Sequence, residues 1–122
     1  EKRVIFLPWT NDTASLYKTA DIFLHTSLYE GYGLALIEAA AAGIPIVTSD
    51  VGIAGSILED EKSAFICPVN DESCFQRKLE MLLGNEAKRR DLSLRASARV
   101  STLSLGKQEY LERYQKALEA CT

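Results

Sequence analysis

Four short apolar runs alternate along this chain with stretches of helical pattern, and this alternation is the strongest constraint on its fold. The runs are rich in β-branched residues and too short to form helices of their own: Val4–Leu7, Ile22–His25, Ile44–Thr48 and Ala64–Val69. Short strands that alternate with helices are typical of βα units on a parallel sheet. The sequence therefore predicts an α/β, Rossmann-like fold with a mostly parallel sheet of about four strands and flanking helices.

Helix start and stop signals place helices between and after these runs. Asn11 or Asp12 suits the N-cap of the first helix, and Gly43 followed by Pro45 suits the end of the second. The predicted helices span Thr13–Ala20, Gly33–Ala42, Ala54–Glu59, Asp71–Leu83, Glu86–Ser101 and Lys107–Ala120. In the last helix, residues at helical spacing form a face of packing groups: Tyr110, Leu111, Tyr114 and Leu118.

Size and composition exclude several classes of protein. With 122 residues the chain has room for one domain, residues 1–122, and one core. The net charge of −3 gives no basic excess, so we expect no nucleic-acid partner. Cys67, Cys74 and Cys121 are odd in number and lack CxxC spacing, which argues against a disulfide framework and a zinc site and favours a reducing interior. No apolar run is long enough to span a bilayer, so we expect a cytoplasmic protein, soluble or peripheral at the inner face of the membrane.

The most informative stretch is the turn and helix over Glu30–Gly43, which follows the predicted strand Ile22–His25. Open α/β sheets bind their ligands at the carboxyl ends of the strands. Gly31 and Gly33 bracket the helix start, where the lack of side chains lets a ligand approach bare backbone. The first-turn N–H groups have no helical partner, and the helix dipole adds partial positive charge. A phosphate or diphosphate therefore fits this position.

Two glutamates flank the glycine turn. Glu38 is the only charged residue between Leu34 and Ala42, and because this helix is apolar all round we expect it to be buried. A buried carboxylate needs a partner, which is either an internal arginine or lysine or a pair of ligand hydroxyls such as those of a ribose. Glu30 lies about 12 Å earlier along a helix, similar to the span from ribose to sugar across a diphosphate. Together the two glutamates favour a nucleotide sugar.

The stretch Glu30–Val47 closely resembles the E-x7-E signature of retaining glycosyltransferases with the GT-B architecture, in particular the bacterial enzymes of the family 4 type. Leu16–Asp21 is similar to the family's L-Y-x-x-A-D, and Ala64–Asp71 to its G-L-L-V-x-P-x-D strand end. Tyr114 and Leu118 resemble its closing Y-x-x-x-L. The resemblance covers nearly the whole chain and implies that residues 1–122 are the nucleotide-sugar-binding part of a GT-B C-terminal domain.

The resemblance implies a role for each motif residue. Glu30, in the catalytic site, would hold hydroxyls of the donor sugar, and Glu38 would bind the ribose hydroxyls. The backbone amides of the turn would cradle the diphosphate: Gly31, Tyr32, Gly33 and Leu34. Trp9 would either border the nucleobase or be a packed surface residue. Because the family's catalytic histidine belongs to the other domain, we interpret His25 as structural.

The resemblance also implies a reaction. The intact enzyme would transfer a hexosyl unit from a UDP-, GDP- or ADP-sugar to a hydroxyl of a carbohydrate or lipid-linked acceptor, with retention of anomeric configuration. The family usually needs no metal, and the sequence shows no carboxylate cluster that suggests one. Stabilisation of the departing diphosphate by the helix amides would carry catalysis, and the glutamates would position the donor.

Several features depart from the family pattern. Gly55 replaces a glutamate in a loop that shapes the donor pocket, and Ser104-Leu105 replaces an aromatic S-W pair. Two further βα units, with an arginine and a lysine that Lys2 and Arg3 do not match, and an acceptor-binding domain are missing. We therefore expect a piece of a longer enzyme, inactive by itself. The missing strands would lie beside Val4–Leu7, so we expect a rearranged sheet or an exposed edge that pairs between chains.

Two other interpretations differ in class. The chain could be a non-catalytic nucleotide or sugar-nucleotide binding module, which would be dimeric if its sheet edges pair. It could also be a dinucleotide-dependent oxidoreductase. That second alternative fails because no G-x-G-x-x-G opens a helix after a strand.

Overall fold

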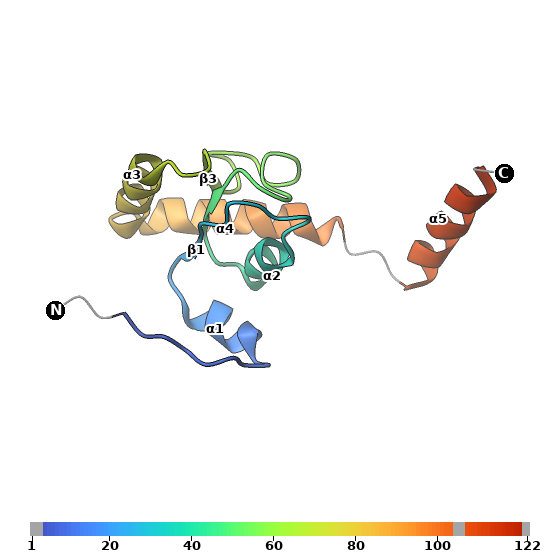
Figure 1. The fold of residues 1–122 in the computed structure, drawn as a ribbon, viewed down its shortest axis with the longest axis horizontal. Helices are drawn as coiled ribbons and strands as arrows, with labels where there is room; N and C mark the ends of the chain where they lie inside the picture. Colours follow the sequence, from blue (N-terminus) through green and yellow to red (C-terminus); the bar gives the residue numbers. More distant parts are fainter. Residues whose placement is uncertain (1–3, 104–106, 121–122) are drawn as a thin grey trace.

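The structure is a computed structural model that describes residues 4–103 and 107–120 (Figure 1). In chain order the elements are α1 (Thr13–Thr19), β1 (Phe23–His25), α2 (Leu34–Ala42), β2 (Ile46–Ser49), β3 (Phe65–Cys67), α3 (Glu72–Leu83), α4 (Glu86–Ser101) and α5 (Lys107–Ala120). The three strands form one parallel sheet in the order β1-β2-β3, with helices around it. The predicted α/β class with a parallel sheet is confirmed.

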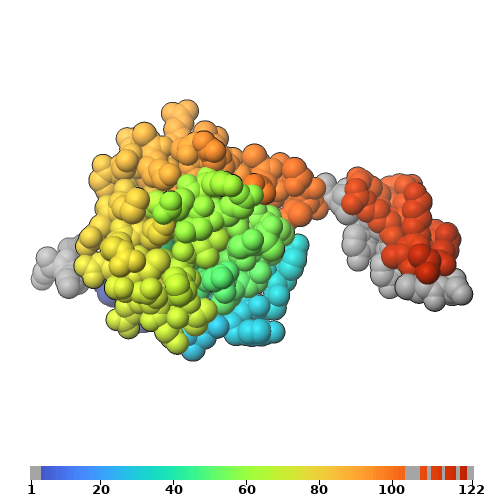
Figure 2. All heavy atoms as spheres, turned by 90° about the horizontal axis from the view of Figure 1, so that it is seen from above, coloured from blue at the N-terminus to red at the C-terminus, as the bar shows by residue number. Residues whose placement is uncertain are grey.

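The central strand β2 separates two apolar cores, because successive strand residues point to opposite faces. Ile46 belongs to a core that it shares with α2 and the second half of α4: Leu36, Ala39, Ala40, Ala96 and Val100. Val47 belongs to a second core on the other side: Phe65, Leu82 and Leu92, with Phe75 and Leu79 packed against it. Because α4 contributes to both cores, it ties the two sides of the sheet together. Figure 2 shows α4 lying along the loop region 50–64.

Side-chain and glycine caps set most of the helix ends. The Asp12 side chain accepts a hydrogen bond from the backbone N–H of Ser15 at the start of α1, and Asp71 accepts from Cys74 at the start of α3. Gly43 closes α2 in the left-handed conformation, with φ at 75°. These caps confirm the predicted boundaries of the helices to within a residue.

The prediction of a strand over Val4–Leu7 is wrong, and the sheet has three strands rather than four. The segment is extended and forms no ladder within the described residues, and its side chains are exposed, with Phe6 at 92%. Apolar β-branched composition favours an extended backbone, but a strand also needs a neighbour to pair with. In Figure 1 the segment runs past α1 instead of joining the sheet.

The predicted helix over Ala54–Glu59 is also absent, and a series of turns takes its place. Ala54 and Leu58 form an isolated parallel bridge, and the backbone N–H of Gly55 donates to the carbonyl of Leu58. Gly55 has φ at 75° and Gly52 has φ at 59°. These left-handed positions interrupt the repeat of helical dihedral angles, so the segment folds as a compact loop.

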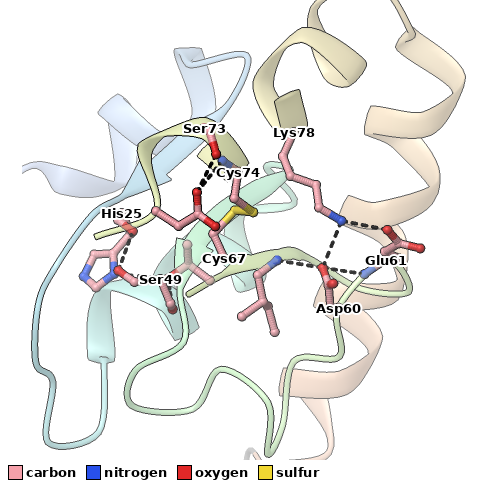
Figure 3. The surroundings of a disulfide bond; sticks show 11 residues. His25, Ser49, Asp60, Glu61, Cys67, Ser73, Cys74 and Lys78 are labelled. Atoms are coloured by element: carbon pink, nitrogen blue, oxygen red, sulfur yellow. Dashed lines mark hydrogen bonds and ion pairs between the residues drawn. A yellow bond between two sulfur atoms is a disulfide. The ribbon is translucent and has the colours of Figure 1, made fainter. Parts of the chain in front are cut away.

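A disulfide joins Cys67, at the end of β3, to Cys74, in the first turn of α3 (Figure 3). The prediction of no disulfide is therefore wrong. The odd number of cysteines carried no information about which of them the fold brings together, and the cap at Asp71 turns the chain so that α3 starts beside β3. The disulfide also removes the argument by which we predicted a reducing compartment, because such bonds are rare in the cytosol.

The last helix, α5, stands apart from the sheet in both views of the molecule (Figures 1 and 2). Leu111 is half exposed. The predictions for the side chains of Tyr110, Tyr114 and Leu118 lie outside what the structure describes. The same holds for the predictions on Ser104-Leu105, Lys2, Arg3 and Cys121. Within the described ranges, every helix is too short or too polar to cross a membrane.

Candidate donor-binding site at the start of α2

The candidate site is the turn that leads from β1 into α2. β1 ends at His25 and α2 begins at Leu34, so the turn lies at the carboxyl edge of the parallel sheet. Gly33 is the N-cap residue of α2 and has φ at 90°, a conformation that L side chains rarely adopt. It is buried, and a Cβ there would lie 3.2 Å from Cδ1 of Leu36. Gly33 is thus required by the fold itself.

Gly31 differs from Gly33 in both respects. Its φ is not positive, and a Cβ built on it would meet no atom within 4 Å. Nothing in the described chain therefore requires a glycine at position 31. The backbone of Gly31 faces open space, which is what we expect of a position that a ligand approaches closely.

The first backbone amides of α2 are available to a ligand. The N–H groups of Leu36 and Ile37 donate to the carbonyl of Gly33, but within the described residues the N–H groups of Leu34 and Ala35 have no acceptor. No side chain caps this end of the helix, in contrast to α1, α3 and α4. Unpaired amides and the positive end of the helix dipole make this a place where an anion is stabilised.

The loop after β2, which contains Gly52, packs against the turn. Gly52 has φ at 59°, and a Cβ on it would lie 2.5 Å from the carbonyl oxygen of Tyr32 and 3.2 Å from Cβ of Glu30. The loop after β2 therefore packs directly against the backbone of the turn. The sequence analysis missed Gly52. Its signal was the sequence Val51-Gly52 shortly after the predicted strand Ile44–Thr48, at the end of the sheet where site loops gather.

Glu30 belongs to a cluster of polar side chains rather than standing alone. Its Oε1 lies 3.2 Å from Nε2 of His25 and accepts a hydrogen bond from the Ser27 hydroxyl at 2.9 Å. Ser27 Oγ is also 3.2 Å from Nε2 of His25. The His25 side chain is 11% exposed and that of Glu30 is 32% exposed. The histidine that we interpreted as structural thus contacts the first motif glutamate.

Two buried hydroxyl residues of β2 form the floor beneath this cluster. Thr48 Oγ1 lies 3.3 Å from Nδ1 of His25 and donates to the carbonyl of Ser49 at 3.0 Å. The Ser49 hydroxyl lies 2.6 Å from the carbonyl oxygen of Ser27, and 3.3 Å from that of His25, the contact drawn in Figure 3. These contacts hold the turn to the sheet. The acid and the serine share one ring nitrogen, so the cluster is not a nucleophilic serine triad, in which they lie on opposite nitrogens.

Glu38 lies at a different place from the one predicted. Of the α2 residues only Leu36, Ala39 and Ala40 are buried, and Glu38 is exposed, so the prediction of an all-round buried helix is wrong. A helix that packs with one face on a small domain leaves its other face open, whatever its composition. Oε2 of Glu38 accepts a hydrogen bond from the Tyr17 hydroxyl at 3.2 Å, and within the described residues no cation pairs with this carboxylate.

Two pockets lie beside α2, one lined by Glu38 and the other by Tyr32. Glu38 and Tyr17 border a pocket of about 380 Å³ between α1 and α2. Burial, and then the negative charge of Glu38, raises the pKa of the Tyr17 hydroxyl, which therefore stays a hydrogen-bond donor. Tyr32 lines another pocket of about 470 Å³ between α2 and the end of α4. Trp9 is 84% exposed on the N-terminal segment, and among the described residues no hydrogen bond or ring contact joins it to the turn.

Comparison with known families decides what kind of protein this is. Residues 1–99 match the family described as "Glycosyl transferases group 1". The chain belongs to this family. The recognition that we made from the glycine turn and its two glutamates is therefore confirmed at the level of the family.

Curated glycosyltransferases of the family are similar to this chain over most of its length. The UDP-Gal:alpha-D-GlcNAc-diphosphoundecaprenol alpha-1,3-galactosyltransferase of Escherichia coli is 33% identical over 75 residues, which are 62% of this chain and 19% of that enzyme. The N-acetyl-alpha-D-glucosaminyl L-malate synthase of Bacillus anthracis is 31% identical over 96 residues, 79% of this chain and 25% of that enzyme. The chain thus spans a fifth to a quarter of the length of these relatives.

Solved structures of glycosyltransferases share the fold. The sucrose-phosphate synthase of Thermosynechococcus elongatus superposes with a TM-score of 0.75 at 28% identity, over 88% of this chain and 27% of that one. The Anabaena protein HepE in complex with UDP-glucose superposes with a TM-score of 0.78 at 25% identity, over 84% of this chain and 28% of that one. This chain thus shares its fold with a protein whose structure was solved in complex with UDP-glucose.

Proposed function

We propose that this chain is the donor-binding part of a glycosyltransferase and that the turn between β1 and α2 binds a nucleotide-diphosphate sugar. The observation that carries the proposal is the bare backbone at the start of α2. The N–H groups of Leu34 and Ala35 have no acceptor among the described residues. A Cβ on Gly31 would meet no atom within 4 Å, so packing does not explain why a glycine stands there. A diphosphate supplies both the acceptors and the close approach. The likeness in fold to HepE, which was solved in complex with UDP-glucose, supports it.

In this proposal the amides of Gly31, Tyr32, Gly33 and Leu34 cradle the diphosphate. Glu30, at one end of the turn, holds hydroxyls of the sugar. Glu38 holds the ribose hydroxyls from the pocket that it lines with Tyr17. Both carboxylates act by positioning the donor, which lowers the entropy lost on reaching the transition state. The reaction proposed for the whole enzyme is transfer of a hexosyl unit to an acceptor hydroxyl with retention of configuration and without a metal.

The second candidate function is a binding module that takes up the nucleotide sugar without turnover. The observation in its favour is that, in the part of the chain described, no lysine or arginine forms an ion pair or hydrogen bond with the turn or with Glu30. Departure of a diphosphate is strongly helped by cations placed near it. We therefore expect the 122-residue chain to bind donor and not to transfer sugar.

Calorimetric titration of the purified chain with UDP-, GDP- and ADP-glucose and with GDP-mannose tests the proposal. One nucleotide should bind clearly more tightly than the others. The substitution Glu38→Ala should weaken its binding roughly tenfold, the loss expected for a charge-assisted hydrogen bond to a hydroxyl. Glu80→Gln, a change of an exposed acid on α3 away from the turn, is the matched control and should bind as the unaltered chain does. Equal, millimolar binding of all four compounds would refute the proposal.

Product analysis separates the two candidate functions. A chain that also carries an acceptor-binding domain should release a product whose anomeric proton coupling matches that of the donor sugar, with the same rate in EDTA. Turnover by the 122-residue chain alone would contradict the binding-module expectation. An inverted product would contradict the proposed mechanism while leaving donor binding intact.

A further inference from the structure

We infer that His25 and Ser27 position Glu30 by holding one of its two carboxylate oxygens, so that the other is presented to hydroxyls of the donor sugar. This inference rests on the proposed function. It assigns a task to the only histidine of the chain, which we interpreted from the sequence as structural.

The contacts of Glu30 divide its oxygens into two kinds. Oε1 is 2.9 Å from the Ser27 hydroxyl, which donates to it, and 3.2 Å from Nε2 of His25. Oε2 has no partner among the described residues, and the side chain is one-third exposed. A carboxylate that is held on one side and open on the other is oriented before a ligand arrives, and orientation set in advance lowers the cost of binding.

The directions of the hydrogen bonds identify the proton that holds Glu30. The Ser27 hydroxyl has a single proton, which it gives to Oε1 of Glu30. A carboxylate oxygen only accepts, so the approach of Nε2 to Oε1 requires a proton on Nε2. The ring therefore donates from Nε2 to Glu30.

The surroundings fix the ring in this orientation. The ring of Phe23 stacks on it with centroids 5.9 Å apart, and Thr48 Oγ1 lies 3.3 Å from Nδ1. Thr48 itself is fully buried in β2. The imidazole thus packs between Phe23 and the central strand β2, with Nδ1 toward Thr48 and Nε2 toward Glu30. A side chain held in this way directs a hydrogen bond with little loss of side-chain entropy.

Nitrogen-15 NMR of the chain tests the hydrogen bond without any ligand. Because the chain has one histidine, its two ring nitrogens are assigned without ambiguity once any purification tag is removed. At pH 7 we expect a proton on Nε2, slowed in its exchange with water, and we expect the Glu30→Ala variant to lose that slow exchange. A ring with its proton on Nδ1 alone would overturn the inference. This result does not depend on whether a nucleotide sugar binds.

Titration with UDP-glucose and with UDP then tests the consequence for the donor. The His25→Ala variant should lose roughly tenfold in affinity for UDP-glucose and keep its affinity for UDP, since only the sugar contacts Glu30. His25→Gln, whose side-chain amide places an N–H donor toward Glu30, should recover most of the loss. Ser27→Ala should show a smaller loss of the same kind, and Ser73→Ala, on α3, is the matched control.

The outcomes separate this inference from the proposed function. Equal losses of affinity for UDP and UDP-glucose in the His25 variants would assign the residue a merely structural role and overturn the inference. UDP-glucose affinity that is unchanged in both His25 and Ser27 variants would overturn it as well. If neither UDP-glucose nor any other nucleotide sugar binds the unaltered chain, the proposed function fails, while the NMR experiment still decides whether His25 holds Glu30.

Discussion

The most direct test of how the site is built is the substitution Gly52→Ala. An added Cβ would lie 2.5 Å from the carbonyl oxygen of Tyr32 and 2.9 Å from its carbonyl carbon. Both are backbone atoms, so the turn that carries Glu30 has to move. Two costs add up. The left-handed conformation of an L residue costs about 1–2 kcal/mol, and overpacking against backbone costs a further 1–3 kcal/mol, roughly.

Gly43→Ala is the matched control for this substitution. Gly43 also has a positive φ, 75°, but a Cβ on it would meet no atom within 4 Å. It therefore carries the conformational cost, about 1–2 kcal/mol, without the overpacking. The difference between the two variants isolates the contact between the loop after β2 and the turn.

Urea denaturation gives the two free energies of unfolding, and amide chemical shifts report where the structure changes. We expect Gly52→Ala to be less stable than Gly43→Ala by at least about 1 kcal/mol and to shift the amide resonances of Gly31 and Tyr32. Donor affinity should fall in the first variant only. Equal stability of the two variants, with unchanged shifts in the turn, would refute the claim that Gly52 supports the site.

Three further predictions follow from the contacts described. Reduction of Cys67–Cys74 with dithiothreitol should lower the free energy of unfolding by about 2.5 kcal/mol, the loop entropy for a separation of 7 residues, and should leave a double alanine variant unchanged. Hydrogen bonds from Ser73 and Cys74 lower the pKa of Asp71, and those from Ser15 lower the pKa of Asp12. The stability that the two ionised carboxylates contribute is therefore present above their ordinary pKa of 3.8 and is lost as the pH falls through their lowered pKa values. The urea midpoint should therefore drop on acidification, and Asp71→Asn should make that drop smaller. Tyr17→Phe removes the hydrogen bond that holds Glu38, so it should weaken binding of a ribose nucleotide about threefold and should not weaken binding of its 2′,3′-dideoxy counterpart.

Local signals in the sequence predicted the elements that local interactions determine. Asp12 is one of the two N-cap candidates named for the first helix and Gly43 is the predicted end of the second, and both are caps in the structure because both act within one turn of backbone. The glycine turn was found for the same reason, since its chemistry lies in consecutive residues. Assignment of the family then rested on the spacing of the two glutamates around it.

Features that depend on partners distant in the sequence were not predicted. Val4–Leu7 has strand composition, but composition does not supply a neighbouring strand. The apolar composition of α2 gave no information about how much of its surface the rest of the domain covers. His25 and Glu30 are separated by a turn without periodicity, so nothing in their spacing indicated the contact between them. In each case the deciding quantity is the three-dimensional neighbourhood.

The central position of β2 affects which parts of the molecule open in local unfolding. All four of its residues are buried, and both of its edges are hydrogen-bonded to parallel strands, so its amides should be the slowest in the chain to exchange with deuterium. Partial openings that release α1 or α5 leave this strand in place. The hydroxyls of Thr48 and Ser49 therefore keep their positions during such fluctuations, and the site can re-form around them without refolding of the domain.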